Sequence, residues 1–197
     1  MPISLAYVAA TLRAQGYAVT VIDAFAEQTA QVRTDDGFVR FGLTDQEIIN
    51  RLPHDVTCIF VYAINLTNHL ATVSAVRTIK SARPRVPVVV LENTQAVTAY
   101  ALREVADEFY RAGADFILTG EGDWRAVRLV DVLGRGASAA QLRGVDGLGS
   151  PACYQPPQET IADLDAVPFP AWDLFPLEAY WKLRHAHGPL ETDRYLP

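Results

Sequence analysis

Three apolar runs, each followed by a helical pattern, constrain the fold of this sequence more than any other feature. They cover residues 56–63, 87–91 and 114–118 and recur at roughly 28 residues, a spacing typical of βαβ units. Nearly continuous apolar runs are typical of strands that are covered on both faces. The sequence therefore predicts an α/β fold built on a doubly wound parallel sheet.

Helical patterns surround these runs. Gly16 stands at the position where the first helix is expected to end. Thr44 and Glu47 are spaced as a capping box, in which each side chain satisfies a free backbone amide of the other. We expect helices over residues 5–15, 44–52, 70–79, 98–111 and 124–133.

Two segments between the first helix and the first apolar run add β structure. Residues 19–23 are rich in β-branched side chains and predict a short strand. Residues 32–41 alternate on both sides of an Asp-Gly turn and predict a small β-hairpin insertion. Open α/β domains usually begin with a strand that feeds the first helix, so we expect the first strand to be missing and the sheet to have a gap.

The regular alternation stops after Gly134. Residues 136–197 are rich in glycine and proline, and prolines at 168 and 170 interrupt any regular element there. We therefore expect one α/β unit over residues 1–135 and a loop-rich C-terminal connector over residues 136–197.

Composition and charge exclude several classes of function. Seventeen Lys and Arg against 23 Asp and Glu give a net charge of −6, which argues against nucleic-acid binding. No apolar run approaches the ~20 residues that span a bilayer, so we expect no membrane association. The N-terminus lacks the basic region of a secretory signal, and we expect a cytoplasmic location.

The sequence shows no metal site and no catalytic constellation. Cys58 lies within an apolar run, Cys153 lies in a loop-rich segment, and no CxxC or CxxxCxxC pattern is present. His185 and His187 form a His-Ala-His pattern without partner carboxylates, and His69 lies beside a strand end. We assign no metal ligands and no catalytic residues.

The loops after the three runs are the candidate binding site, because open parallel sheets bind ligands beyond the carboxyl ends of their strands. These loops are residues 65–69, 92–95 and 119–122. The last contains Gly-Glu-Gly and opens a helix, but Arg125 stands where a dinucleotide fingerprint has its third glycine. A nucleotide site that uses Arg125 as its cation remains a weaker alternative.

Several segments, in order, resemble the cobalamin-binding domains of radical SAM enzymes. Residues 2–17 and 21–24 are similar to the first helix and second strand of those domains. Residues 113–123 resemble their Gly-Ala-Asp strand and Gly-Glu-Gly-Glu turn. Residues 161–165 and 168–174 resemble their connector to the catalytic barrel, so the likeness covers nearly the whole chain.

The resemblance implies a Rossmann-like (flavodoxin-like) domain over residues 1–135 that holds cobalamin at the carboxyl ends of its strands. It implies that residues 136–197 lead towards a radical SAM barrel, in which a CxxxCxxC motif holds a 4Fe-4S cluster and S-adenosylmethionine. Many members of the family are methyltransferases. Because this sequence lacks the cysteine motif, we expect a non-catalytic part of such an enzyme, with the barrel as a further domain or a partner subunit. Self-association into a homo-oligomer is also expected to be possible.

Topology and the resemblance together assign cofactor contacts in three groups. The loop after the first run would bind the corrin amides through Asn65, Thr67 and Asn68. The loop after the second run would line the groove of the nucleotide tail with Glu92, Asn93 and Thr94. The turn after the third run would approach a neighbouring edge of the corrin through Gly120, Glu121 and Gly122.

One departure supports an alternative. The family commonly has Gly-Gly after its fourth strand, whereas this chain has Glu92 and Asn93. Larger side chains crowd a closely approaching ligand. The alternative is a degenerate Rossmann-like interaction module that binds no corrin, in which Thr67 or Asn68 caps a helix and Asn93 forms a turn.

Overall fold

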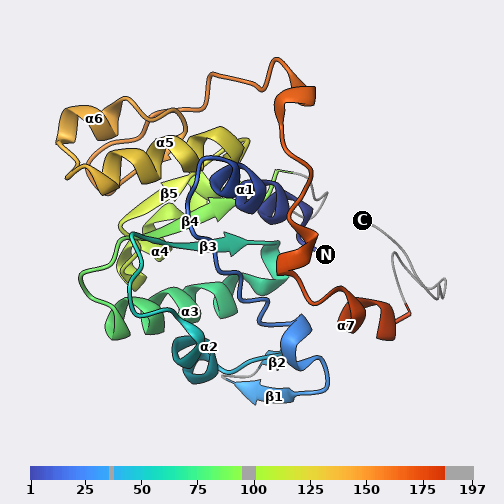
Figure 1. Ribbon diagram of the computed structural model, residues 1–197. Coiled ribbons are helices and arrows are strands. Elements are labelled where there is room, and N and C mark those ends of the chain that lie inside the picture. Colours follow the sequence, from blue (N-terminus) through green and yellow to red (C-terminus); the bar gives the residue numbers. More distant parts are fainter. Residues whose placement is uncertain (36–37, 95–100, 185–197) are drawn as a thin grey trace.

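The sheet predicted from the apolar runs is present in the computed structural model, which describes residues 1–35, 38–94 and 101–184 (Figure 1). Strands β3 (Ile59–Ala63), β4 (Val88–Glu92) and β5 (Phe116–Leu118) are parallel, and β6 (Leu148–Gly149) pairs antiparallel with β5. The order is β3-β4-β5-β6. This is a mostly parallel α/β sheet, consistent with a Rossmann-like fold.

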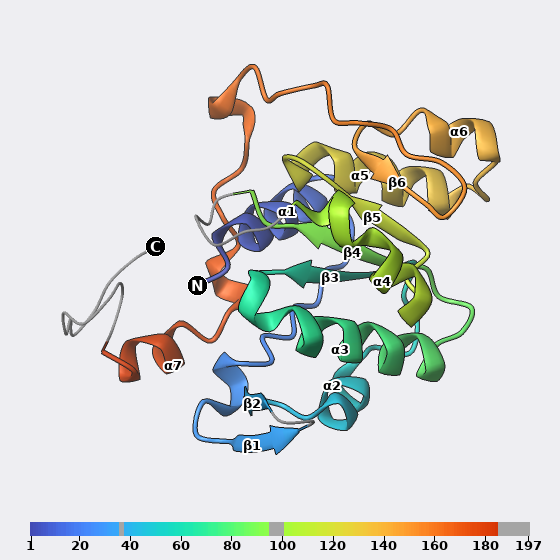
Figure 2. The same cartoon turned by 180° about the vertical axis from the view of Figure 1, so that it is seen from behind.

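Helices cover both faces of the sheet (Figures 1 and 2). Helices α3 (His69–Ala82) and α4 (Ala106–Ala112) pack on one face, and α1 (Ile3–Ala14) and α5 (Gly122–Gly134) pack on the other. Side chains of β4 alternate between the two resulting cores, with Val88 and Val90 in one and Val89 and Leu91 in the other. Because these four side chains are at most 1% exposed, β4 forms the centre of the molecule.

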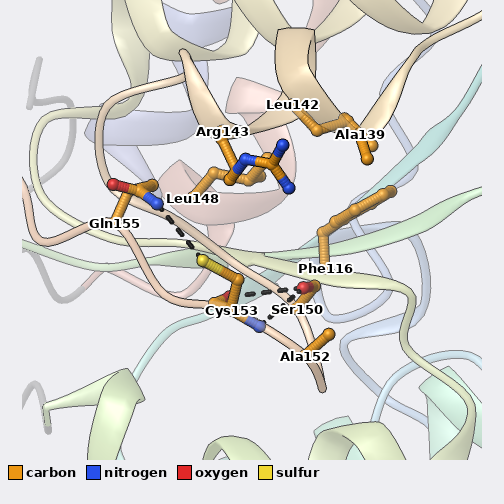
Figure 3. A pocket seen from close by; sticks show the side chains of 9 residues that line it. All are labelled: Phe116, Ala139, Leu142, Arg143, Leu148, Ser150, Ala152, Cys153 and Gln155. Atoms are coloured by element: carbon orange, nitrogen blue, oxygen red, sulfur yellow. Dashed lines mark hydrogen bonds between the residues drawn. The ribbon is translucent and has the colours of Figure 1, made fainter.

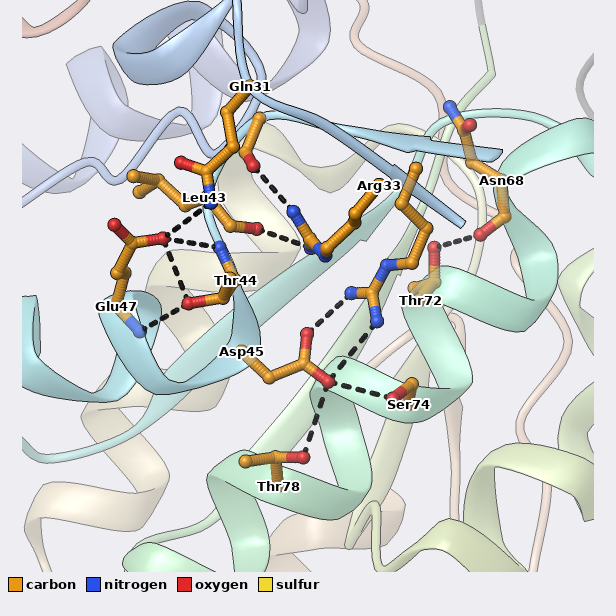
Figure 4. Close-up of polar contacts among 12 residues, drawn as sticks. Gln31, Arg33, Leu43, Thr44, Asp45, Glu47, Asn68, Thr72, Ser74 and Thr78 are labelled. Carbon is orange, nitrogen blue, oxygen red and sulfur yellow. Dashed lines mark hydrogen bonds and ion pairs between the residues drawn. The ribbon is translucent and has the colours of Figure 1, made fainter. Parts of the chain in front are cut away.

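The predicted hairpin is confirmed as β1 (Val32–Asp35) and β2 (Phe38–Phe41), which pair antiparallel. It leads into α2 (Asp45–Arg51), whose predicted capping box between Thr44 and Glu47 is present (Figure 4).

Asp45, at the start of α2, fastens the hairpin to the domain. Its carboxylate pairs with Arg40 of β2 and accepts hydrogen bonds from Ser74 Oγ (2.7 Å) and Thr78 Oγ1 (3.4 Å) of α3 (Figure 4). Burial raises the pKa of this carboxyl, but the hydrogen bonds from Arg40 and Ser74 outweigh burial and hold the pKa below its usual value.

Two expected elements differ in the structure. Residues 19–23 form no strand, because a strand requires a hydrogen-bonded neighbour and none of the described strands pairs with them. The helix expected over residues 98–111 falls partly outside the described residues. Within them, a 3-10 turn (Leu102–Val105) leads into α4, which ends at Ala112.

The C-terminal connector carries short elements and returns across the domain (Figure 1). It contains α6 (Ala139–Arg143), β6, the 3-10 turns η4 (Leu164–Ala166) and η5 (Trp172–Leu174), and α7 (Leu177–Lys182). Helix α7 ends beside the 3-10 turn η1 (Ala26–Gln28).

Three contacts fasten the connector to the N-terminal part of the chain. Ala171 donates its amide to the carbonyl of Ala6 (3.0 Å), Asp173 pairs with Arg13, and Tyr180 donates its hydroxyl to Asp23 (2.6 Å). Within the described part of the chain, no helix combines the length and apolar character that crossing a bilayer requires.

Candidate functional site

The three parallel strands end at one edge of the sheet, and their polar loops meet there. Asn93, after β4, donates its side-chain amide to the carbonyl of Ile64, after β3, at 2.6 Å. Gly120, after β5, donates its backbone amide to Glu92 Oε2 at 2.7 Å. The structure therefore brings together the three loops that the sequence analysis assigned to the site. We refer to this edge as the carboxyl edge.

Glu92 satisfies two backbone amides at the carboxyl edge. Its second carboxylate oxygen, Oε1, accepts a hydrogen bond from the amide of Leu102 at 2.9 Å. One side chain thus joins the end of β4 to the turn after β5 and to the turn before α4. Neighbouring Asn93 is only 7% exposed, whereas Thr94 is exposed.

The loop after β3 offers exposed polar groups. Asn65 Oδ1 accepts hydrogen bonds from the hydroxyl of Thr67 (2.7 Å) and the amide of Asn68 (3.2 Å). Asn65 thereby caps the 3-10 turn η2 (Leu66–Asn68). Asn68, one of the two helix caps that the sequence analysis offered, occupies the N-cap position of α3, but its side chain makes no capping hydrogen bond. Asn68 instead contributes its carbonyl, which accepts the hydroxyl of Thr72 at 2.8 Å (Figure 4).

Apolar side chains lie beside these polar groups. Ile64, Leu66 and Leu70 are 40%, 64% and 58% exposed. Leu66 lies in the 3-10 turn η2, and Leu70 lies in the first turn of α3 that follows it. The end of β3 therefore combines an apolar surface with hydrogen-bonding groups, which suits a flat ligand with a polar rim.

Internal packing accounts for both glycines of the Gly-Glu-Gly turn. Gly120 has φ +75°, and a Cβ there would lie 2.8 Å from Arg125 Nη1. A Cβ on Gly122 would lie 2.6 Å from Leu91 Cδ1. Between them, Glu121 accepts the amide of Ile161 at 3.0 Å and so holds part of the connector.

Arg125 is buried beside the turn after β5, and its guanidinium bonds to the protein itself. It is 7% exposed, its Nε donates to Asp146 Oδ2 (2.8 Å), and its Nη1 and Nη2 donate to the carbonyls of Glu121 and Glu159. All three nitrogens are thus used internally, which argues against the alternative of a nucleotide site built on Arg125.

Asp146 is a structural residue that the sequence did not reveal. It also accepts the backbone amides of Gln158 (2.8 Å) and Glu159 (3.2 Å). Burial raises the pKa of its carboxyl, but these amides and Arg125 together outweigh burial and lower the pKa. Asp146 stands between Gly144 and Gly147 in a sequence that is typical of an ordinary turn, so no sequence signal marks its structural role.

His69 ends the loop after β3 but is held by α4, and Cys58 precedes β3, at the other end of that strand. His69 is 9% exposed, lies 3.1 Å from Glu108 Oε2 through Nε2 and contacts the ring of Phe109 edge-on, so it faces α4. Burial raises the pKa of the Cys58 thiol to about 12, which makes it unreactive. His185 and His187 lie outside the described residues. Among the described residues, no cluster of three or more potential ligands could hold a metal ion.

A small cavity of about 120 Å³ lies between Phe116 of β5 and the first part of the connector (Figure 3). Phe116, Leu142 and Leu148 form part of its wall, and Cys153 and Gln155 lie at its polar side. None of the residues assigned to the cofactor lines this cavity, so it is separate from the carboxyl edge.

Comparisons with known proteins point to methyltransferases. The cytidylyl-2-hydroxyethylphosphonate methyltransferase of Streptomyces wedmorensis is 25% identical over 219 aligned residues, which cover 95% of this chain and 39% of that protein. An uncharacterized methyltransferase of Pyrococcus horikoshii is 31% identical over 87 residues, which cover 42% of this chain and 18% of that protein. No protein-family model and no solved structure matches the chain. The chain is therefore similar, at low identity, to part of proteins named as methyltransferases.

Proposed function

We propose that this chain is the cobalamin-binding, non-catalytic part of a radical SAM methyltransferase. The observation that carries the proposal is the similarity to a named methyltransferase along 95% of the chain. Since that similarity spans 39% of the relative, the catalytic machinery belongs to a further domain or a partner subunit. That partner would hold the 4Fe-4S cluster and S-adenosylmethionine, and we place the enzyme in the cytoplasm.

The end of β3 fits a corrin. The exposed side chains of Ile64, Leu66 and Leu70 would contact the face of the ring, and Asn65 and Thr67 would bind its peripheral amides. When bound, cobalamin would supply a methyl group for transfer. The residues of this chain would orient the ring and exclude water from one of its faces.

The end of β4 fits the nucleotide tail less well. Glu92 already accepts the amides of Leu102 and Gly120, and Gly120 and Gly122 pack against the chain itself. This geometry favours the second candidate, an interaction module that binds no corrin. The two candidates differ in whether the carboxyl edge binds cobalamin or only another protein.

Corrin retention after desalting separates the two candidates. Purified protein is incubated with hydroxocobalamin and desalted, and its visible absorption spectrum is recorded. We expect near-stoichiometric retention, and we expect loss of the corrin bands in Leu66→Glu, because the new charge lies where the ring would pack. Leu164→Glu is the matched control, since Leu164 is 72% exposed and also lies in a 3-10 turn, but in the connector.

A folded but colourless wild-type protein would rule out cobalamin binding by this chain alone. Glu92→Ala then tests whether the Glu92 carboxylate is what prevents cobalamin from binding. If the variant retains corrin, the Glu92 carboxylate blocks the tail groove, whereas a colourless variant supports the interaction module. Circular dichroism confirms that each variant is folded.

A further inference from the structure

The cavity beside Phe116 lies where the sheet meets the first part of the connector, and we refer to it as the connector cavity (Figure 3). Phe116 of β5 and Leu148 of β6 line it from the sheet, and Ala139 and Leu142 line it from α6. Its volume of about 120 Å³ is close to the ~150 Å³ of an apolar cavity that binds benzene. The connector cavity therefore suits an apolar group the size of a ring or a branched chain.

The turn after β6 gives the connector cavity a fixed polar side. Ser150 donates its amide to the carbonyl of Cys153 at 2.7 Å, and Ser150 Oγ accepts the amide of Cys153 at 3.2 Å. Gln155 donates its backbone amide to the carbonyl of Leu148 at 2.8 Å. Hydrogen-bonded segments thus bound the cavity, as they do in ligand sites that are formed before the ligand binds.

Arg143 brings an uncompensated positive charge to the connector cavity. Its side chain extends among the residues that line the cavity (Figure 3). Among the described residues, its guanidinium has no hydrogen-bond or ion-pair partner. By contrast, Arg125 pairs with Asp146. Arg128 pairs with Glu159. A free guanidinium can bind a carboxylate through two parallel hydrogen bonds.

A second cavity selects among the anions that Arg143 could bind. This cavity, of about 200 Å³, shares Arg143 and Gln155 with the connector cavity. Asp146 and Glu159 also line it, so two carboxylates lie near the guanidinium. They would repel a doubly charged phosphate, whereas Arg143 can neutralise one carboxylate. The charges therefore favour a ligand with a single negative charge.

We propose that the connector cavity binds a small carboxylic acid. Its apolar group, a ring or a branched chain, fills the space beside Phe116 and Leu142, and its carboxylate pairs with Arg143. The apolar group gains contacts, because the lining of a void has no partner atoms on that side. The bound acid joins β5, α6 and the turn after β6, so it ties the first part of the connector to the sheet. The proposal does not depend on cobalamin, since none of the residues assigned to that cofactor lines this cavity.

Cys153 makes occupancy of the connector cavity measurable. The sequence has two cysteines, of which Cys153 is exposed and lines the cavity, whereas burial raises the pKa of Cys58 to about 12. Only Cys153 should therefore react with N-ethylmaleimide, a neutral reagent, and intact mass measures the rate. We expect about tenfold slower modification at about 10 mM phenylacetate, the protection that a Kd of about 1 mM gives.

Two further compounds separate the contributions of charge and ring. Phenylacetamide has the same ring but no charge, and acetate has the charge but no ring. Each should slow the modification of Cys153 by less than about twofold at the same concentration, because each lacks one of the two contacts.

Two pairs of matched variants locate the site. Arg143→Gln should reduce the protection by phenylacetate to less than about twofold. Arg85→Gln is its control, since Arg85 is also exposed and has no side-chain partner among the described residues. Ala139→Leu should also abolish protection, because the larger side chain occupies the cavity. Ala140→Leu is its control, at an exposed position of the same helix that does not line the cavity. The rate of each variant without phenylacetate is its own reference.

NMR provides a second measurement that does not depend on the thiol. Titration with phenylacetate should shift the amide signals of Ser150 and Ala152, which line the cavity, and such shifts without protection would still support the proposal. Folded wild-type protein that shows neither protection nor shifts would overturn it. Equal protection by phenylacetamide, or full protection in Arg143→Gln, would overturn it too, because the cavity would then bind apolar groups without recognising a carboxylate.

Discussion

Glu92 determines how the carboxyl edge is held together. Its carboxylate accepts two backbone amides from loops that follow different strands. A carboxylate can accept both bonds at once, whereas a side-chain amide presents one oxygen and one donor group. Glu92 is thus a structural link between three segments of this chain.

Glu92→Gln should lower the free energy of unfolding by about 1–2 kcal/mol, because one backbone amide loses its acceptor and faces an N–H group instead. Chemical denaturation measures the change. Glu104→Gln, at an exposed position, is the control and should differ from wild type by less than about 0.5 kcal/mol. Equal stabilities of the two variants would show that the Glu92 bonds contribute nothing measurable.

Asp146→Asn should be more damaging, by about 3 kcal/mol, because Arg125 would be left buried without its counter-charge. The side chains of this pair are only 8% and 12% exposed. Glu159→Gln is the comparison, since the Arg128–Glu159 pair is 57% and 70% exposed and 3.5 Å apart. That variant should lose less than about 0.5 kcal/mol in the same denaturation experiment.

Asp146 should also contribute to acid unfolding. Its pKa is lowered in the folded protein, so its stabilising effect is complete above the unfolded pKa of about 3.9 and is lost as pH falls through the folded pKa. The stability of wild-type protein should therefore fall more steeply below about pH 4 than that of Asp146→Asn. Parallel stability–pH curves for the two proteins would contradict this assignment.

At the scale of elements, the β1–β2 hairpin exposes its apolar face and buries its charged face, the reverse of the usual arrangement. Val32, Val39 and Phe41 share one face and are 56%, 57% and 55% exposed. On the opposite face Arg40 is 8% exposed and pairs with Asp45, and Arg33 donates to the carbonyls that follow β2. Charge complementarity, rather than apolar contact, therefore holds the hairpin on α2 and α3.

Substitutions at two neighbouring positions of β2 should lower the free energy of unfolding by very different amounts. Arg40→Gln should lower the free energy of unfolding by about 3 kcal/mol, because Asp45, whose side chain is 17% exposed, would lose the counter-charge it pairs with. Val39→Thr, at the exposed position beside it, should change that free energy by less than about 0.5 kcal/mol. Thermal and chemical unfolding of both variants check this, and a larger loss in Val39→Thr would mean that the exposed face packs against something.

Local sequence patterns predicted most of the helices and strands, because the apolar pattern of each element reflects which of its side chains are buried. The continuous runs that became β3, β4 and β5 carry their signal within a few residues. The segment 19–23 carries an equally clear strand pattern, yet strand formation depends on a neighbour that no local pattern records. Strand β6 has only two residues and no pattern of its own.

The site was predictable in position but not in detail. Strand ends of a parallel sheet meet at one edge, so the three loops could be named from the sequence. The bond from Gly120 to Glu92 joins residues 28 positions apart and follows from the folded geometry alone. Because Glu92 has internal partners, the assignment of this residue to a ligand stays a prediction.

At the scale of the whole molecule, the connector holds the N-terminal elements in place. Residues 171–180 contact α1 and the segment that leads to η1 through Ala171, Asp173 and Tyr180. Ala171 is 1% exposed and packs on Ala9 and Ala10, where only a small side chain fits. The C-terminal part of the described chain is thereby fixed beside α1 and Asp23.

Ala171→Glu should release the connector from α1. The free-energy cost of burying a carboxylate without a partner exceeds the stabilisation that the contacts around residue 171 provide. We expect trypsin to cleave after Lys182 about tenfold faster, since local opening exposes that bond before global unfolding does. Phe169→Glu is the matched control, because Phe169 is 95% exposed and the same charge there disturbs no contact. Equal cleavage rates in the two variants would mean that the connector opens independently of Ala171.

A faster cleavage rate in Ala171→Glu, with unchanged protection of the Val61 amide against hydrogen exchange, would show that the connector and the sheet are separate cooperative units.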